Sequence, residues 1–455
     1  MNASRKAERT EAILHGSLWK AILLIAIPVM INSLLQTLYN LTDTYWLGRI
    51  GTEPLAAINL VSPVQGIIVS FGSGFTVAGA VLLSQLIGAG KPAQARKMAN
   101  QIFMSAMVFS AVCIAALESL MPFIMNWLGA EGRVLGYAYD YLRIVTLDIP
   151  FLFTINLYQS VRQSQGDTVS PMLLNLLGIG LNMVLDPLLM VVWKLNATGA
   201  ALATLLAKTV PALIALRLLR RAEETMRLEC ACMKPDKAML KEIARIGLPT
   251  SFGASVSHIG FLMMTRSVFS YGVNAIAAYG IANKSNSLNS LPSSGIGAAV
   301  ATIVGQNMGA GQVKRAEKGY RAAMGGIVAL LMAAGVVLSR RPVAEAIVSI
   351  FSTDPDVIAM AADYFGLMAM WTWNNGVLDC TASLFRACGH TGVTMVNDIA
   401  RIWVFRFATL FVCQRLLGLG VESIWYSVVI SNGLAALMMF VLYLTGMWKK
   451  NKIKV

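Results

Sequence analysis

The feature that most restricts the fold of this 455-residue chain is a set of long stretches without a single charged residue. Three of them run over residues 54–90, 98–117 and 423–448. A helix needs about 20 mostly apolar residues to cross a bilayer, and each stretch reaches that length. Charged residues make up 13% of the whole chain, against about 25% in soluble domains. The sequence therefore predicts an integral membrane protein.

Apolar segments of this kind recur along the whole chain, and their pattern is helical. Strands of a membrane barrel would alternate between polar and apolar residues over about 10 positions, and these segments do not alternate. We therefore predict an all-α polytopic membrane protein with twelve transmembrane helices. The predicted spans cover residues 18–43, 54–84, 98–117, 138–160, 168–191, 197–216, 246–268, 275–305, 321–339, 358–383, 393–413 and 423–447.

The formal net charge of +14 comes from basic residues that gather in every second loop. Lys and Arg precede the first predicted span, follow the second, sixth and eighth, and end the chain, with Arg340 and Arg341 as an exception. Basic residues favour cytoplasmic loops, so this charge indicates membrane topology and no affinity for nucleic acid. We expect a multi-pass protein of the plasma membrane, embedded in the lipid bilayer, with both termini in the cytoplasm.

An internal repeat divides the chain into two halves. Residues 72–97 align with residues 293–318 at an offset of 221, and 10 of the 26 aligned positions are identical. Because each half holds six spans, the repeats are parallel, and they predict two six-helix lobes related by a pseudo-two-fold axis along the membrane normal. The predicted parts are a cytoplasmic N-terminal tail (1–17), an N-lobe (18–216), a cytoplasmic linker (217–245), a C-lobe (246–447) and a basic cytoplasmic tail (448–455).

Glycines repeat at the end of the aligned segments. Gly88 and Gly90 match Gly309 and Gly311, and each pair follows a long apolar run and precedes a basic stretch. Glycine adopts positive φ angles at no steric cost, and such a residue commonly ends a helix. We expect these glycines to turn the chain at the cytoplasmic face, in a structural role.

Four segments carry a resemblance to a known family. They are TDTYWLGRIGTEPLAAI at 42–58, the paired turns QLIGAG and GQNMGAG, VRQSQGDTVSPMLLN at 161–175, and NMVLDP at 182–187. With its six plus six spans, the chain resembles the multidrug and toxic compound extrusion (MATE) exporters, in particular their DinF-like bacterial branch. The resemblance implies a secondary active antiporter that expels amphipathic, cationic small molecules in exchange for H+ or Na+, without a cofactor and as a monomer.

Other functions are weighed against this one. A flippase or exporter of a lipid-linked saccharide or of a native metabolite has the same two-lobe architecture, and a duplicated bundle can also form a channel. An enzyme is not expected, because the sequence contains no HExxH or GxSxG motif. No Walker A motif is present either, so ATP is not expected to drive transport directly.

Polar residues of the first predicted span share one face and end in an acid. A charge at the bilayer centre costs on the order of 3 kcal/mol, so an acid within a span is expected to have a function. Asp43 follows three amides at helical spacings, and Tyr39 lies beside this face. The amides are Asn32, Gln36 and Asn40.

The fifth predicted span carries a similar stripe. Asn175, Asn182 and Asp186 recur at intervals of seven and four residues, which places them on one helix face. Acids on two helices of one half predict a shared site that holds a proton or a Na+ during transport. The alternative is that Asp43 caps its helix at the outer interface and that Asp186 ends a helix before Pro187.

The resemblance assigns further roles in the N-lobe. It implies that cation coupling uses Asp43, Asn182, Asp186 and Thr204, with Na+ bound at the first three of these residues. Gln159 stands where the family often has an asparagine. Residues expected to line the substrate cavity are Gln36, Tyr39, Asn40, Gln159, Asn175 and Lys284.

Two further expectations concern a proline and the charges of the C-lobe. Pro28 interrupts the first span and is predicted to kink it, since proline removes a backbone hydrogen bond. Lys284 lies in the eighth span, and a buried lysine needs a partner, for which Asp379 or Asp398 is expected. A C-lobe polar network of Asp379, Asp398 and Arg401 is predicted either to hold the lobe together or to line the cavity.

Overall fold

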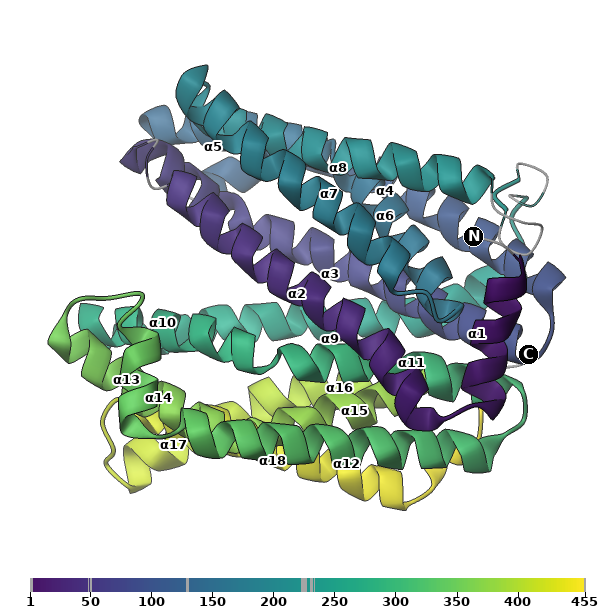
Figure 1. Cartoon of the computed structure of the whole chain (residues 1–455). Coiled ribbons are helices and arrows are strands. Elements are labelled where there is room, and N and C mark those ends of the chain that lie inside the picture. Colours follow the sequence, from purple (N-terminus) through teal and green to yellow (C-terminus); the bar gives the residue numbers. More distant parts are fainter. Residues whose placement is uncertain are drawn as a thin grey trace. The chain divides into compact units, whose positions relative to one another are not determined.

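The computed structural model describes residues 3–47, 49, 51–127, 131–221, 227–229, 232 and 234–453. Parts of the predicted linker and of both tails, with Gly48 and Ile50 of one quoted motif, lie outside these residues. The described residues form helices joined by short connections and contain no strand. The all-α prediction is therefore confirmed (Figure 1).

All twelve predicted spans correspond to helices or runs of consecutive helices. The first half contains α2 (Leu18–Leu47), α3 (Thr52–Gly88), α4 (Pro92–Trp127), α5 (Gly132–Thr146) with α6 (Ile149–Ser164), α7 (Val169–Asp186) with the π-helical η1 (Pro187–Val192), and α8 (Asn196–Arg220). The second half contains α9 (Lys237–Phe269), α10 (Val273–Asn289) with α11 (Leu291–Gly309), α12 (Val313–Leu338), α14 (Pro355–Trp371) with α15 (Trp373–Ala387), α16 (Thr391–Ile399) with η3 (Ala400–Arg406), α17 (Phe407–Phe411) and η4 (Val412–Leu416), and α18 (Glu422–Leu444).

Three short elements were not predicted. They are α1 (Ala3–His15), α13 (Arg341–Val348) and the 3-10 turn η5 (Met447–Lys449). The helix α1 lies within the predicted N-terminal tail, where Arg9 forms an ion pair with Asp167 at 3.0 Å. Burial alone would raise the pKa of Asp167, but hydrogen bonds from Ser170 and Arg9 outweigh it and lower the pKa below its usual value.

Several of the twelve spans are broken or carry charges. Seven described helices are long and apolar enough to cross a membrane, and the pair α5 and α6, bent by 42°, makes an eighth. Each of the other four predicted spans is interrupted or charged, as in α9, whose first three turns contain Lys237, Lys241 and Arg245. Hydropathy alone places such spans less well, because ionisable residues lower the mean of any window that contains them.

Contacts divide the described chain into two compact units. The first unit covers residues 3–10 and 31–251, and the second covers residues 11–30 and 252–453. The division therefore passes through α1, and through α2 and α9 just after Pro28 and Pro249, which the repeat aligns. In the predicted lobes α2 and α9 each belong wholly to their own half, whereas here the beginning of each of these two helices packs with the other unit. A kink at Pro28 stays a prediction.

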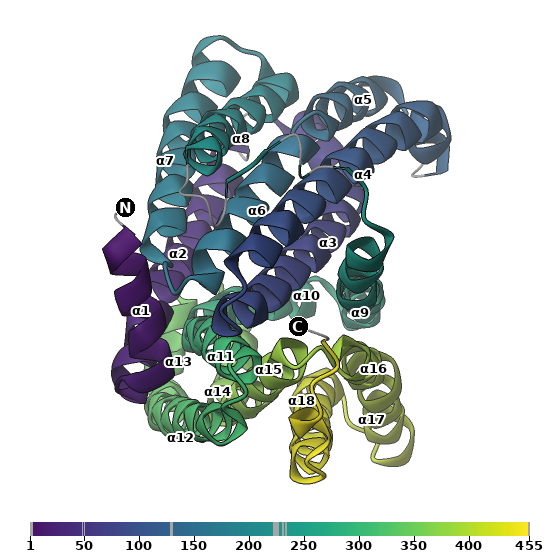
Figure 2. The same ribbon diagram turned by 90° about the vertical axis from the view of Figure 1, so that its right-hand side faces the viewer.

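In the first unit, α3 packs against α4, α5 and α6, and α8 packs against α5, α6 and α7 (Figure 2). Its cores contain fully buried Ala57 and Val61 of α3 and Phe153 of α6. In the second unit, α11, α12, α15 and α18 form one apolar core. A second apolar core lies where α10 packs against α14. Within each unit, apolar contacts between helices hold the fold together.

The paired glycine turns adopt the same conformation in both halves. Gly90 has a φ of +65° and Gly311 a φ of +73°. The amide after each glycine closes the turn: the N–H of Lys91 donates to Leu86 at 3.0 Å, and the N–H of Gln312 donates to Asn307 at 2.7 Å. The predicted positive angle is confirmed at these two positions. It is wrong for Gly88 and Gly309, which end the helices α3 and α11.

Replacing Gly311 by alanine is expected to destabilise the protein by about 1 to 2 kcal/mol, because a side chain disfavours this left-handed backbone. No atom lies within 4 Å of the added methyl group, so the cost is conformational and not steric. Thermal unfolding in detergent measures it. Gly325→Ala is the matched control, since Gly325 is helical and equally open, and a gain of about 0.5 to 1 kcal/mol is expected there. Equal losses in both variants would contradict this account.

Candidate functional site

The two predicted acids of the first half come together in the first unit. Asp186 is buried near the end of α7, and its Oδ1 accepts a hydrogen bond from Nδ2 of Asn182 at 3.1 Å. The carboxyl group of Asp43, on α2, lies within hydrogen-bonding reach of that of Asp186. Because carboxylates only accept, a hydrogen bond between the two acids requires a proton on one of them.

Two buried oxygen atoms at this acid pair have no hydrogen-bond donor among the described residues. They are Oδ2 of Asp186 and Oδ1 of Asn182. Leaving a buried polar atom unpaired costs about 1 to 3 kcal/mol. Binding a cation at these oxygen atoms would therefore be favourable. Tyr39 interacts electrostatically with both acids, and its hydroxyl group is hydrogen bonded to that of Thr204 on α8.

A cavity of about 260 Å³ opens beside the acid pair, between α2, α6, α7 and α8. Among the residues that line it are six predicted site residues: Gln36, Tyr39, Gln159, Asn175, Asn182 and Thr204. Amide contacts order its wall, since Nδ2 of Asn175 donates to Oδ1 of Asn32 at 3.1 Å. Asn40 is outside the lining but accepts a hydrogen bond from Gln36 at 3.5 Å. Asn182 therefore both lines the cavity and contacts the acid pair through Asp186.

A second charged pair in this unit was missed by the sequence analysis. Nζ of Lys208 lies 2.5 Å from Oδ2 of Asp148, which sits at the break between α5 and α6 with its side chain 4% exposed. Lys208 lines the cavity. A charged residue in the middle of an apolar run was the available signal, but 60 residues separate the partners and no local pattern links them.

In the second unit the predicted polar network is only partly as expected. Asp379 interacts electrostatically with Asp398 and Arg401, as predicted, and also with Arg386. Lys284 is exposed, and no ion pair joins it to another described residue. The prediction that Lys284 pairs with Asp379 or Asp398 is therefore wrong, because arginines supply the positive charge near Asp379. Lys284 belongs to the second unit, and its predicted place in the substrate cavity stays a prediction.

Arg406 is a further residue that the sequence analysis missed. Its side chain is buried, and its guanidinium group donates to Oγ of Ser431 and to Oδ1 of Asn432, each at 3.1 Å. The same group lies 5.2 Å from the ring centre of Phe261, at a distance typical of a cation–π contact. Neutral partners thus hold a buried positive charge in the second unit. Among the described residues, no three His, Cys, Asp or Glu side chains gather as metal ligands.

Removing one partner of the Lys208–Asp148 pair is expected to destabilise the protein. In Lys208→Met the carboxylate of Asp148 stays buried without its cation, at a cost of about 3 kcal/mol. In the double variant Lys208→Met with Asp148→Leu neither charge remains, and most of the stability should return. Thermal unfolding of the purified protein in detergent measures all three chains. If the double variant is no more stable than the single variant, the loss does not come from an uncompensated charge on Asp148.

Comparisons with known proteins identify the family. The MatE family model matches residues 28–188 and 249–412. The multidrug export protein MepA of Staphylococcus haemolyticus is 27% identical over 432 residues, 94% of each chain. The probable multidrug resistance protein NorM of Thermotoga maritima is 26% identical over 447 residues, 95% of this chain and 94% of NorM.

The same fold is found in solved structures. A multidrug resistance MATE family transporter of the MOP superfamily, in an outward-facing conformation, superposes with a TM-score of 0.91 at 24% identity, over 97% of this chain and 98% of that one. Its twelve helices in two lobes confirm the predicted fold class. The family transports small molecules across membranes by ion coupling and is not enzymatic. This chain belongs to the MATE family of multidrug export transporters.

Proposed function

We propose that this transporter expels amphipathic, cationic small molecules in exchange for H+ or Na+, with the acid pair Asp43 and Asp186 as its cation-coupling site. The observation that carries the proposal is the pairing of two acids beside a cavity, with two buried oxygen atoms that lack a donor among the described residues. The basic loops favour cytoplasmic termini, and the protein acts as a monomer in the plasma membrane.

The chemistry of the pair explains why it would bind a cation. Two carboxylates in contact repel each other strongly when both are charged in a medium of low dielectric constant. A shared proton removes one of the charges. A Na+ places one positive charge between the two carboxylates and could also use Oδ1 of Asn182, since carboxylate and amide oxygens are ligands for hard cations. A proton would pair Oδ2 of Asp186, whereas a Na+ could be bound by both unpaired oxygens.

The cavity connects the pair to the transported molecule. Its wall offers amide groups from Gln36, Gln159 and Asn175, and Asn182 extends from this wall to Asp186. A cationic molecule in the cavity is favoured while the acids are charged and disfavoured once they have bound a cation. Each ligand therefore weakens the binding of the other by the same factor, as linkage requires. This mutual exclusion is the basis of antiport.

Asp43→Asn and Asp186→Asn are each expected to abolish efflux driven by an ion gradient, because an amide can neither release a proton nor compensate a Na+. Efflux of a cationic dye from proteoliposomes is measured under separately imposed proton and sodium gradients, which also identifies the coupling ion. Asp140→Asn is the matched control, since Asp140 is an exposed acid of the same unit, and it should transport normally. Full efflux by either site variant would remove that residue from coupling.

A milder change tests the hydroxyl network around the pair. Thr204→Val keeps the shape of the side chain but removes the hydroxyl group that is hydrogen bonded to Tyr39. We expect about a tenfold lower affinity for the coupling ion, which corresponds to about 1.4 kcal/mol, measured as the ion concentration for half-maximal efflux.

Thr209→Val is the control on the same helix. The hydroxyl group of Thr209 donates to the carbonyl oxygen of Leu205 in its own helix, away from the acids. Equal shifts in the two variants would mean that the loss of any threonine hydroxyl group from α8 impairs transport, and that Thr204 has no particular role.

A further inference from the structure

A second cavity lies in the first unit, apart from the coupling site. It has a volume of about 520 Å³ and is enclosed by α3, α4 and the beginning of α9. This volume is within the range of about 300 to 1,000 Å³ that is typical of ligand pockets. Its interior is apolar, with the aromatic rings of Phe71, Phe75 and Phe109 on one side. Val108, Val112 and Leu248 also line it and are more than half exposed, as expected at a mouth that opens to lipid.

The inner wall of this cavity is a close crossing of two helices. A methyl group added to Gly74 would lie 2.6 Å from the carbonyl oxygen of Gly247, and one added to Gly247 would lie 3.3 Å from that of Gly74. Oγ of Ser251 donates to the carbonyl oxygen of Phe71 at 3.4 Å. The backbones of α3 and α9 therefore approach each other closely at Gly74 and Gly247.

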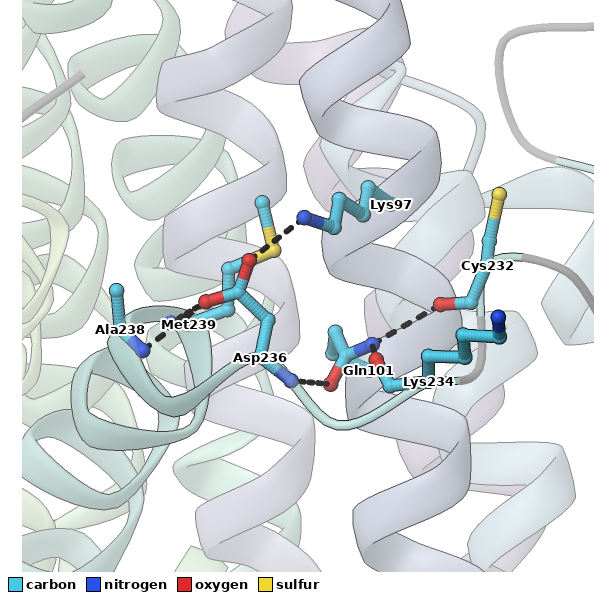
Figure 3. Close-up of polar contacts among 7 residues, drawn as sticks. All are labelled: Lys97, Gln101, Cys232, Lys234, Asp236, Ala238 and Met239. Carbon is cyan, nitrogen blue, oxygen red and sulfur yellow. Dashed lines mark hydrogen bonds and ion pairs between the residues drawn. The ribbon is translucent and has the colours of Figure 1, made fainter.

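One end of the cavity is closed by the linker that precedes α9. Figure 3 shows how Gln101 of α4 holds it: Nε2 donates to the carbonyl oxygens of Cys232 at 2.9 Å and Lys234 at 2.7 Å, and Oε1 accepts from the N–H of Asp236 at 3.1 Å. Pro235, between these contacts, lines the cavity. Lys97 forms an ion pair with Asp236 at 2.6 Å, and its hydrogen bond lowers the pKa of that carboxyl group.

Lysines without an ion-pair partner surround the same end. The side chains of Lys234, Lys237 and Lys241 are exposed, and none is paired with an acid among the described residues. Lys237 precedes Ala244 by seven residues, so the two share one face of α9, and Ala244 lines the cavity. The apolar chamber therefore continues into a group of free positive charges.

We propose that this cavity binds an anionic phospholipid, with an acyl chain in the chamber and the phosphate headgroup at Lys234, Lys237 and Lys241. The chamber matches the chain in polarity, and the lysines match the charge of the headgroup. Basic pockets beside transmembrane helices recognise anionic headgroups in this manner, and long lysine side chains reach the interface while their stems stay on apolar surface. The lipid would occupy the junction of linker and α9 that Gln101 organises.

Native mass spectrometry of the purified full-length protein tests this site without any transport measurement, so its result does not depend on the coupling proposal. The protein is titrated with phosphatidylglycerol or phosphatidylcholine. One phosphatidylglycerol should bind about tenfold more tightly than phosphatidylcholine. Lys237→Gln with Lys241→Gln should remove that preference, because these two lysines carry two of the three positive charges proposed to hold the phosphate. Lys314→Gln with Lys318→Gln is the control, because these exposed lysines have the same spacing at the start of α12.

A second pair of variants tests the chamber. Ala244→Phe fills it and should abolish tight binding of the one lipid, whereas Ala116→Phe, at an exposed position of α4 outside the cavity, should leave it unchanged. Ser105→Phe, which fills the chamber from α4, replaces Ala244→Phe if that variant does not fold. Equal binding of the two lipids by the unmodified protein, or equal losses in the control variants, would overturn the proposal.

Discussion

Charge within an apolar bilayer is the constraint on which this structure depends, and two charged side chains within the helices show how partners meet it. Lys208 is compensated by Asp148, and the guanidinium group of Arg406 by neutral oxygens of α18. Asp43 and Asp186 are different, because here two groups of the same charge lie next to each other. This contact between two acids costs free energy when both are charged. In the proposed function a mobile cation offsets that cost, whereas the pair of Lys208 and Asp148 needs no added ion.

The sequence predicts the helices and the polar stripe of α7 because both follow from local periodicity. Apolar runs define the spans, and a period of 3.6 residues places Asp186 and Asn182 on one face. Contacts between distant segments follow no such rule. The pairing of Lys208 with Asp148, the exposure of Lys284 and the break between α5 and α6 all depend on which helices become neighbours. A single sequence carries little information about that choice.

The repeat also relates two of the points at which the compact units divide. Pro28 and Pro249 occupy equivalent positions, and the division passes through α2 and α9 just after them. Proline lacks the N–H that would bond to the carbonyl oxygen four residues earlier, so the helix loses one of its own restraints at this point. In each half, the place where a single helix passes from one unit to the other is therefore also a place where it can bend at low cost.

The two halves have diverged where the cation chemistry lies. At the offset of 221 residues, Asp43 corresponds to Met264, Asp186 to Phe407 and Asn182 to Trp403. Met264 is fully buried in an apolar core, and the indole N–H of Trp403 donates to the carbonyl oxygen of Val256. Side chains of this kind can neither hold a proton nor coordinate Na+. The second half therefore shares the helical architecture but lacks these acids, and the proposed coupling site has no counterpart at the equivalent positions.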